Sequence, residues 1–252
     1  MPGAGWPHAG AMNGTPDPAR NVALLIDADN ASPDRLDGVL TVLAELGPVN
    51  IRRAYGNWEK PALVGWKKST IANAIEPQQQ FDVTKGKSAT DMKMIIDAMD
   101  LLHGRRVDGF GIMSSDSDFR PLAMRIRQEG LPVYGFGEAK TPPSFQQACT
   151  RFFDVGALAA PEAPAGAPPS PEQPKREVDQ EVIELIGRAI KGAKKRDERG
   201  YAPLSEVKSL AGNQSSFDAR NYGFNNLAEL VRRVGNFSTD ERDDGLWIRR
   251  MR

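Results

Sequence analysis

The sequence predicts an α/β fold with a mainly parallel sheet covered by helices on both faces, followed by a small winged-helix-like α+β unit. Two observations predict the sheet. Short apolar runs of strand length alternate with amphipathic stretches of helical period. The first run, residues 22–26 (VALLI), is apolar throughout, as expected of a strand that is buried on both faces. Right-handed crossovers between parallel strands then place helices on both faces of the sheet.

The remaining elements of this first region follow in order. After the first strand, residues 36–46 carry apolar residues at helical spacing, and Gly47 and Pro48 end that helix. The further expected strands are residues 49–55, 79–83, 110–113 and 132–136. The further expected helices are residues 61–74, 91–103 and 121–129, and residues 144–152 continue the alternation.

A change of composition divides the chain. Residues 157–174 are almost wholly Ala, Pro, Gly, Ser and Glu, and such a segment cannot bury enough apolar surface to offset the ordering of its backbone. We therefore expect a linker at residues 157–176 between a first domain, residues 21–156, and a second domain, residues 177–252. Residues 1–20, rich in Gly, Pro and Ala, are expected to be a disordered tail.

The second domain is predicted to consist of three helices and a terminal hairpin. Residues 178–193 form an apolar face at helical period, and shorter helices are expected at residues 204–210 and 225–234. Two strands, at residues 237–240 and 246–250, flank an Asp-Asp-Gly turn. Helices followed by a hairpin are typical of a small winged-helix unit.

The overall composition excludes several classes of protein. Basic and acidic residues are equal at 33 each, so any affinity for nucleic acid must come from local patches. One cysteine and two histidines exclude a disulfide framework and argue against a Cys/His zinc site. We find neither the apolar core of a signal peptide nor an apolar run near the roughly 20 residues that span a bilayer. We therefore expect a cytoplasmic protein without membrane contact.

Acidic side chains follow two of the predicted strands. Asp27 ends the first strand, and Asp116 and Asp118 follow the strand at residues 110–113. If these two strands are neighbours where the winding of the sheet reverses, their acids converge on one crevice at the carboxyl edge. Asp91, at the start of its helix, is placed to complete the rim, so four carboxylates would share a small volume.

Clustered carboxylates repel one another unless a cation or a proton neutralises them. Mg²⁺ or Mn²⁺ is the expected cofactor, because hard divalent ions prefer oxygen ligands. Such ions acidify water and stabilise a leaving oxygen, which suits phosphodiester hydrolysis with one metal ion or two. Each aspartate also has a local explanation as a turn former or helix cap. Asp97, deeper in the same helix as Asp91, faces either this rim or solvent.

Four separated runs carry a family resemblance: NVALLIDADN, KGKSATDMKMIIDAMD, GFGIMSSDSDFRPLAMRIRQEG and VYGFGEAKTPPSFQQACTRF. In this order they resemble the NYN family, relatives of PIN nucleases, in its bacterial LabA-like branch. The resemblance covers residues 21–155 and implies a PIN-like (Rossmannoid) fold with a divalent-metal ribonuclease site. Asp27, Asp91, Asp116 and Asp118 fall on the acidic positions of the family, and Asn30 falls on its polar position.

Further side chains near these acids are candidates for supporting roles. Ser114 and Ser115 precede Asp116 and are able to donate to a phosphate or orient a carboxylate, although a tight turn also favours serine. Lys85 and Lys87 lie where a cation would hold an incoming phosphate backbone, or simply in a solvated loop. Trp58, near several lysines, is a candidate for stacking on a base.

The run NYGFNNLAELVRRVGNF resembles the LOTUS domain, also called OST-HTH, over residues 178–252. This resemblance implies RNA binding or the docking of a protein partner. Lys194, Lys195, Arg232 and Arg233 are candidate phosphate contacts. Acids are interleaved with them, and a merely solvated surface explains these charges equally well.

We derive three hypotheses. The leading one is a metal-dependent ribonuclease whose second domain selects the RNA, with its mode of cutting and oligomeric state undetermined. The second is a catalytically inactive RNA-binding adaptor. The third is an aspartate-based phosphatase in which Asp27 is the nucleophile and Asp29 the acid, although Asn30 and Ala31 follow where such phosphatases carry Thr or Val.

Overall fold

The computed structural model of the 252-residue chain describes residues 21–81, 89–158 and 178–251. The predicted tail, most of the predicted linker, and the candidate residues Lys85 and Lys87 lie outside these described residues. In the described part of the chain, no helix combines the length and the apolar character needed to cross a bilayer.

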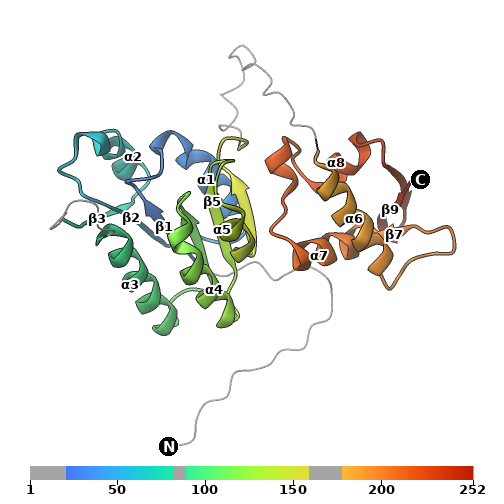
Figure 1. Ribbon diagram of the computed structural model, residues 1–252, viewed down its shortest axis with the longest axis horizontal. Helices are drawn as coiled ribbons and strands as arrows, with labels where there is room; N and C mark the ends of the chain where they lie inside the picture. Colours follow the sequence, from blue (N-terminus) through green and yellow to red (C-terminus); the bar gives the residue numbers. More distant parts are fainter. Residues whose placement is uncertain (1–20, 82–88, 159–177, 252) are drawn as a thin grey trace, which may run out of the picture.

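The larger unit is built on a six-stranded parallel sheet (Figure 1). Its strands are β1 (Val22–Asp27), β2 (Ile51–Gly56), β3 (Glu76–Gln79), β4 (Gly109–Met113), β5 (Val133–Gly137) and β6 (Arg151–Asp154). Their order is β3-β2-β1-β4-β5-β6, and every pair is parallel. The predicted fold class is confirmed. β1 and β4 are neighbours at the point where the winding reverses, so the acids that follow them meet at one edge.

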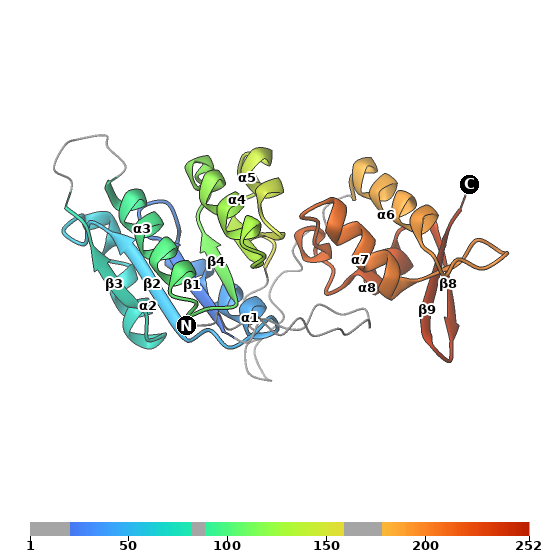
Figure 2. The ribbon, with the colours of Figure 1, turned by 90° about the horizontal axis from the view of Figure 1, so that it is seen from below.

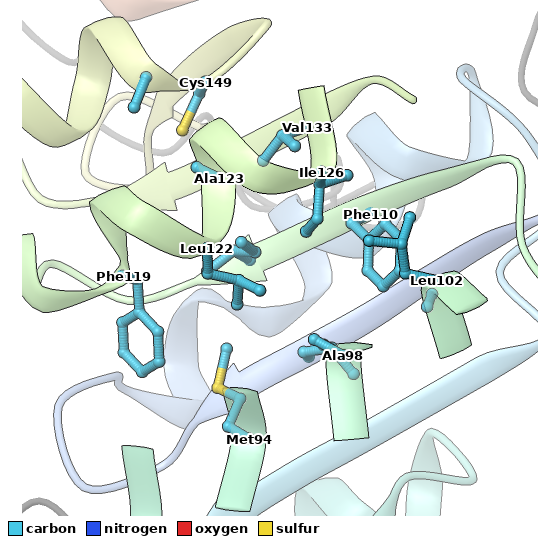
Figure 3. Close-up of a cluster of buried hydrophobic side chains, with 14 of the residues drawn as sticks. Met94, Ala98, Leu102, Phe110, Phe119, Leu122, Ala123, Ile126, Val133 and Cys149 are labelled. Atoms are coloured by element: carbon cyan, nitrogen blue, oxygen red, sulfur yellow. The ribbon is translucent and has the colours of Figure 1, made fainter. Parts of the chain in front are cut away.

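Helices cover both faces of this sheet and bury two separate apolar layers. The helices are α1 (Leu36–Ala44), α2 (Trp66–Ala72), α3 (Ala89–His103), α4 (Arg120–Gln128) and α5 (Pro143–Ala148). Leu24 and Ile26 of β1 belong to the layer with α1, and Leu25 belongs to the layer with α3 and α4. Figure 3 shows part of the second layer, with Met94 of α3 and Ile126 of α4. This two-sided burial explains why β1 is apolar throughout.

Two sequence predictions in this unit were wrong in detail. The predicted strand at residues 79–83 lies earlier, as β3, whose residues Glu-Pro-Gln-Gln are mostly exposed and polar. It is an edge strand that buries little, so no apolar pattern identifies it. The predicted helix at residues 61–74 begins with a 3-10 turn, Pro61–Leu63, and becomes an α-helix only at Trp66. Pro61 suits a first turn because it lacks a backbone donor.

The smaller unit has its own sheet and core. Its elements are α6 (Gln180–Gly192), β7 (Ala202–Pro203), α7 (Leu204–Gln214), the 3-10 helix η4 (Ala219–Tyr222), α8 (Leu227–Arg233), β8 (Phe237–Arg242) and β9 (Gly245–Arg250). The antiparallel order is β7-β9-β8. Ile186, Val207, Leu230 and Ile248 are fully buried in its core. The three helices and the terminal hairpin are confirmed, whereas the two-residue β7 is too short to carry a strand pattern.

The two units meet at β6, the edge strand of the larger sheet. Phe152 donates its backbone N–H to the carbonyl of Ser216 at 3.0 Å. The side-chain amide of Asn221 donates to the carbonyl of Phe152 at 2.9 Å and accepts from the N–H of Asp154 at 2.8 Å. Asn221 therefore satisfies the edge as the backbone of a neighbouring strand would.

Two ion pairs flank this contact between the units. Arg151 of β6 pairs with Asp218, which immediately precedes η4. Arg220 of η4 pairs with Glu45 at 2.5 Å, just beyond the end of α1. Figure 2 shows the smaller unit beside the end of the larger one that carries α5.

Candidate metal centre

Asp27 lies at the carboxyl end of the central strand β1, where it is 1% exposed. Its Oδ2 atom accepts hydrogen bonds from Ser114 Oγ at 2.7 Å and from Asn30 Nδ2 at 3.0 Å. Its Oδ1 atom is buried and has no hydrogen-bond partner among the described residues. A buried carboxylate oxygen held in place and left without a donor fits a cation ligand, because hard divalent ions bind oxygen.

The surroundings of Asp27 make its charge unfavourable. Burial raises the pKa of Asp27 from 3.8 to about 6. The hydrogen bonds from Ser114 and Asn30 lower this pKa, and the negative charges of Asp91 and Asp29 raise it. Near neutral pH the ionised carboxylate therefore lowers the stability of the fold, and a nearby cation would offset this free-energy penalty.

Asp91 and Asp118 line one hollow, which Asp27 itself does not line. Asp91 lies in the first turn of α3, where the helix dipole favours an acid. The charge of Asp91 acts on Asp27. Asp91 and Asp118 both line a hollow of about 910 Å³, together with Arg120 and Arg127. The hollow thus combines carboxylates with two guanidinium groups, which suits a phosphate-bearing ligand in the presence of a cation.

Asp116 has a local structural role as well as its place in the acidic group. Its Oδ1 accepts from the N–H of Asp118 at 2.8 Å and so caps the 3-10 helix η3 (Ser117–Phe119). Its own N–H donates to Ser114 Oγ at 3.0 Å. Ser114 therefore connects the turn after β4 to Asp27 at the end of β1. Ser115 Oγ instead accepts from the N–H of Glu138 at 2.9 Å.

The four acids do not form a preformed metal-binding site. Over residues 21–81, 89–158 and 178–251, no three His, Cys, Asp or Glu side chains come close enough to hold one ion. This differs from the expectation that four carboxylates share a small volume, because Asp116 turns back to cap η3 and Asp118 is exposed. Mg²⁺ usually takes only one or two carboxylates with water and phosphate oxygens, so the donor set around Asp27 still fits such an ion.

Asp97 belongs to a buried network rather than to the rim or to solvent. It is 7% exposed. It accepts from Lys93 Nζ at 2.7 Å, from Tyr55 Oη at 3.1 Å and from Arg53 Nη1 at 3.4 Å. Burial, followed by the charge of Asp97, raises the pKa of Tyr55. Asp97 therefore fastens α3 to β2, and both readings of its position were wrong.

Asp29 also has partners that the sequence does not reveal. Its Oδ1 accepts from Lys60 Nζ and its Oδ2 from Thr90 Oγ1, both at 3.2 Å. The bond from Thr90 joins the turn after β1 to the start of α3, and the bond from Lys60 joins it to the residue before the 3-10 turn Pro61–Leu63. Both carboxylate oxygens of Asp29 are engaged, which does not suit the mobile acid of a phosphatase. Sequence reasoning missed both contacts, because Lys60 and Thr90 are distant in sequence from Asp29.

The candidate RNA contacts are spread over both units. Trp58 donates its indole N–H to the carbonyl of Gln78 at 3.0 Å and packs against the apolar layer under α1. Arg232 forms an ion pair with Glu241. The remaining candidates, whose side chains are exposed, are Lys194, Lys195 and Arg233.

Comparison with known proteins gives matches to both units. The model of the NYN domain family matches residues 21–157, and that of the OST-HTH/LOTUS domain matches residues 173–249. An uncharacterised protein of Methanocaldococcus jannaschii is 28% identical over 138 residues, 53% of this chain and 52% of that protein. The chain thus spans about half the length of this relative. A solved structure of a Vibrio parahaemolyticus protein of unknown function matches at a TM-score of 0.44 and 18% identity, over 56% of this chain and 96% of that one.

Proposed function

The chain belongs to the NYN domain family, part of a nuclease superfamily, and carries a C-terminal OST-HTH/LOTUS domain; from this premise we propose that it is a Mg²⁺- or Mn²⁺-dependent ribonuclease. Its first domain hydrolyses phosphodiester bonds of RNA at the carboxyl edge of the parallel sheet. Its second domain recruits the RNA. We place both activities in the cytoplasm and the boundary between the domains in residues 157–176.

The observation that carries this proposal is the state of Asp27. One oxygen is fixed by Ser114 and Asn30, and the other is buried without a donor among the described residues. A turn former or a helix cap would use its oxygens for local backbone donors. The Asp27 carboxylate accepts hydrogen bonds only from side chains, not from local backbone donors. It lies at the end of β1, where the negative charge of Asp91 acts on it. Such an arrangement supports a ligand for a hard cation.

The residues of this chain divide into ligands and positioning residues. Asp27, Asp91, Asp116 and Asp118 would hold the ion, directly or through water. When bound, a divalent cation supplies acidification of a water nucleophile and stabilisation of negative phosphate oxygens. Ser114 and Asn30 orient the Asp27 carboxylate and limit the rise in its pKa. Arg120 and Arg127, which line the hollow with Asp91 and Asp118, would attract the RNA backbone.

Cleavage of a labelled RNA tests the proposal. The wild-type protein is expected to cleave with Mg²⁺ or Mn²⁺ and not with EDTA, and Asp27→Asn and Asp116→Asn are expected to abolish cleavage. Asp100→Asn, which removes an exposed acid of α3, is the matched control and should cleave normally. Cleavage retained by both site variants would contradict this assignment of the site.

A non-catalytic RNA-binding adaptor is the second candidate function. It is favoured by one observation, the lack of any three metal-ligating side chains close enough to hold one ion in the described part of the chain. An adaptor would bind RNA with the same affinity in Mn²⁺ and in EDTA and would leave the RNA intact. Cleavage of the RNA that requires both Mn²⁺ and Asp27 would exclude the adaptor hypothesis.

A further inference from the structure

The outer face of the small antiparallel sheet carries aromatic and guanidinium side chains. Ile248 points into the core of the second domain and is 0% exposed. Its neighbours on β9, Trp247 and Arg249, therefore lie on the opposite face, because side chains alternate along a strand. Trp247 pairs with Asp240 of β8 and Pro203 of β7, and Arg249 pairs with Ser238.

Four of these side chains form one continuous set, which we call the outer-face stack: Tyr201, Arg242, Trp247 and Arg249. The Arg242 guanidinium lies 4.0 Å from the centre of the Trp247 ring and 5.7 Å from that of Tyr201. The Arg249 guanidinium lies 4.8 Å from the centre of the Tyr201 ring. Rings and planar cations thus alternate across the sheet.

Hydrogen bonds hold each member of the outer-face stack in place. Arg242 donates to Asp197 at 2.6 Å and to Asp240 at 2.8 Å. Trp247 donates its indole N–H to Asp244 at 2.8 Å, and the Tyr201 hydroxyl bonds Ser238 at 2.9 Å. Both rings are fixed at their polar edges and remain partly exposed. A preorganised ring loses little conformational entropy when a flat ligand stacks on it.

We propose that the outer-face stack binds the unpaired bases of single-stranded RNA. Aromatic rings and guanidinium planes are the groups on which unstacked bases lie, and every base offers such a face. A base-paired duplex covers these faces, so it should bind this surface less well. RNA, rather than another single-stranded nucleic acid, is named because the inference rests on the proposed ribonuclease function.

Charge beside the outer-face stack fits the phosphate backbone. Arg242 engages both Asp197 and Asp240, so these two acids are neutralised locally. Arg249 donates to the carbonyl of Arg199 at 3.3 Å, which joins the sheet to the basic segment at residues 194–199. Lys194, Lys195, Arg196 and Arg199 of that segment are exposed. Bases would stack on the rings while these cations contact phosphates.

The position of this surface separates it from the cleavage site. β8 and β9 lie beyond α6 and α7, on the side away from the parallel sheet (Figures 1 and 2). An RNA that engages the outer-face stack must therefore be long enough to pass around the second domain before it reaches Asp27. Loss of the stack should weaken the cleavage of long RNA and leave that of very short RNA unchanged.

Fluorescence anisotropy in EDTA tests binding without cleavage, using the full chain with a labelled mixed-sequence single strand and its duplex. Trp247→Leu and Tyr201→Leu should each bind the single strand roughly tenfold more weakly, as expected for the loss of one stacked base. Trp247→Phe and Tyr201→Phe keep a ring and should retain most of the affinity. Arg188→Leu, which removes an exposed arginine of α6, is the matched control and should bind like the wild type.

The expected pattern has a second, independent readout. Single-stranded RNA should quench the tryptophan fluorescence of the wild type, and Trp247→Phe should lose most of this quenching while still binding. Unchanged affinity in both leucine variants, or equal affinity for duplex, would overturn the inference and favour a protein partner for this face. RNA binding that depends on the two rings, without metal-dependent cleavage, would support the outer-face stack as an RNA-binding surface and contradict the nuclease function. Cleavage that requires Asp27, together with RNA binding that is unchanged when the two rings are replaced, would support the nuclease function and contradict the proposed role of the outer-face stack.

Discussion

Replacement of Asp27 by asparagine should remove a pH-dependent loss of stability from the metal-free protein. The pKa of this carboxyl is raised from 3.8 to about 6 by burial, so folding favours its protonated form. The penalty is absent below pH 3.8, grows as the pH rises toward 6, and is constant above that value. A difference of about two pKa units at about 1.4 kcal/mol each amounts to about 3 kcal/mol.

Urea unfolding in EDTA measures this penalty. Part of the penalty is already present at pH 4.5, and nearly all of it is present at pH 7.5. The free energy of unfolding of Asp27→Asn, relative to that of the wild type, should therefore rise by about 2 kcal/mol between these two pH values. The comparison across pH cancels any constant effect of the new amide group on packing or hydrogen bonding. Asp100→Asn is the matched control for the loss of one carboxylate.

A relative stability that does not change between pH 4.5 and pH 7.5 would refute the reasoning. The same experiment gives a second expectation when Mn²⁺ or Mg²⁺ replaces EDTA at pH 7.5. An ion present at 100 times its dissociation constant should stabilise the wild type by about 2.7 kcal/mol. Asp27→Asn should gain much less, because it lacks the carboxylate that the ion is proposed to bind.

Three further substitutions probe the surroundings of this site, and a fourth probes the contact between the two units. Ser114→Ala removes the donor to Asp27 and should weaken Mn²⁺ binding about 10- to 100-fold in calorimetric titration; an unchanged affinity would contradict the positioning role. Gly137→Ala would put a Cβ 2.8 Å from the carbonyl oxygen of Ser114. This variant should therefore lower the free energy of unfolding by about 1–3 kcal/mol and reduce RNA cleavage. Wild-type stability together with wild-type cleavage would contradict this expectation. Asp97→Ala removes the acceptor of the buried Tyr55 hydroxyl and should lower stability by about 1–3 kcal/mol while cleavage persists; loss of cleavage in a stable variant would make Asp97 part of the site. Asn221→Ala should speed amide hydrogen exchange in β6, measured by mass spectrometry, and unchanged exchange would mean that the contact between the units is dispensable.

The sequence predicts the centre of the fold better than its margins. β1 is apolar throughout because helices cover both of its faces, and its run of five apolar residues identifies it directly. β3 lies at the edge of the sheet, and its residues Glu76–Gln79 are mostly exposed, so burial imposes no pattern on them. The alternation of strands and helices leaves the strand order open, and the observed order, with β1 next to β4, meets the condition under which Asp27 lies at the same edge as the turn that contains Asp116.

Contacts between distant segments explain what sequence reasoning missed at the site. The spacing of Asp97 along α3 leaves its environment open, because Tyr55 and Arg53 reach it from β2, more than 40 residues earlier. Asp116 caps a 3-10 helix that begins with Ser117, and the sequence alone does not show how far this turn carries it from Asp27. Residue types at strand ends predict which acids matter, but not how closely they approach one another.

The contact of Asn221 with β6 bears on how the first domain would behave alone. In the full chain, the backbone groups of Phe152 and Asp154 on the open side of β6 are occupied by Ser216 and Asn221. A protein shortened to residues 21–158 would present these groups to solvent beside the apolar residues Phe152 and Phe153. Strands from other chains would then be able to add to this edge. The second domain, besides any role with RNA, would therefore protect the first domain from self-association.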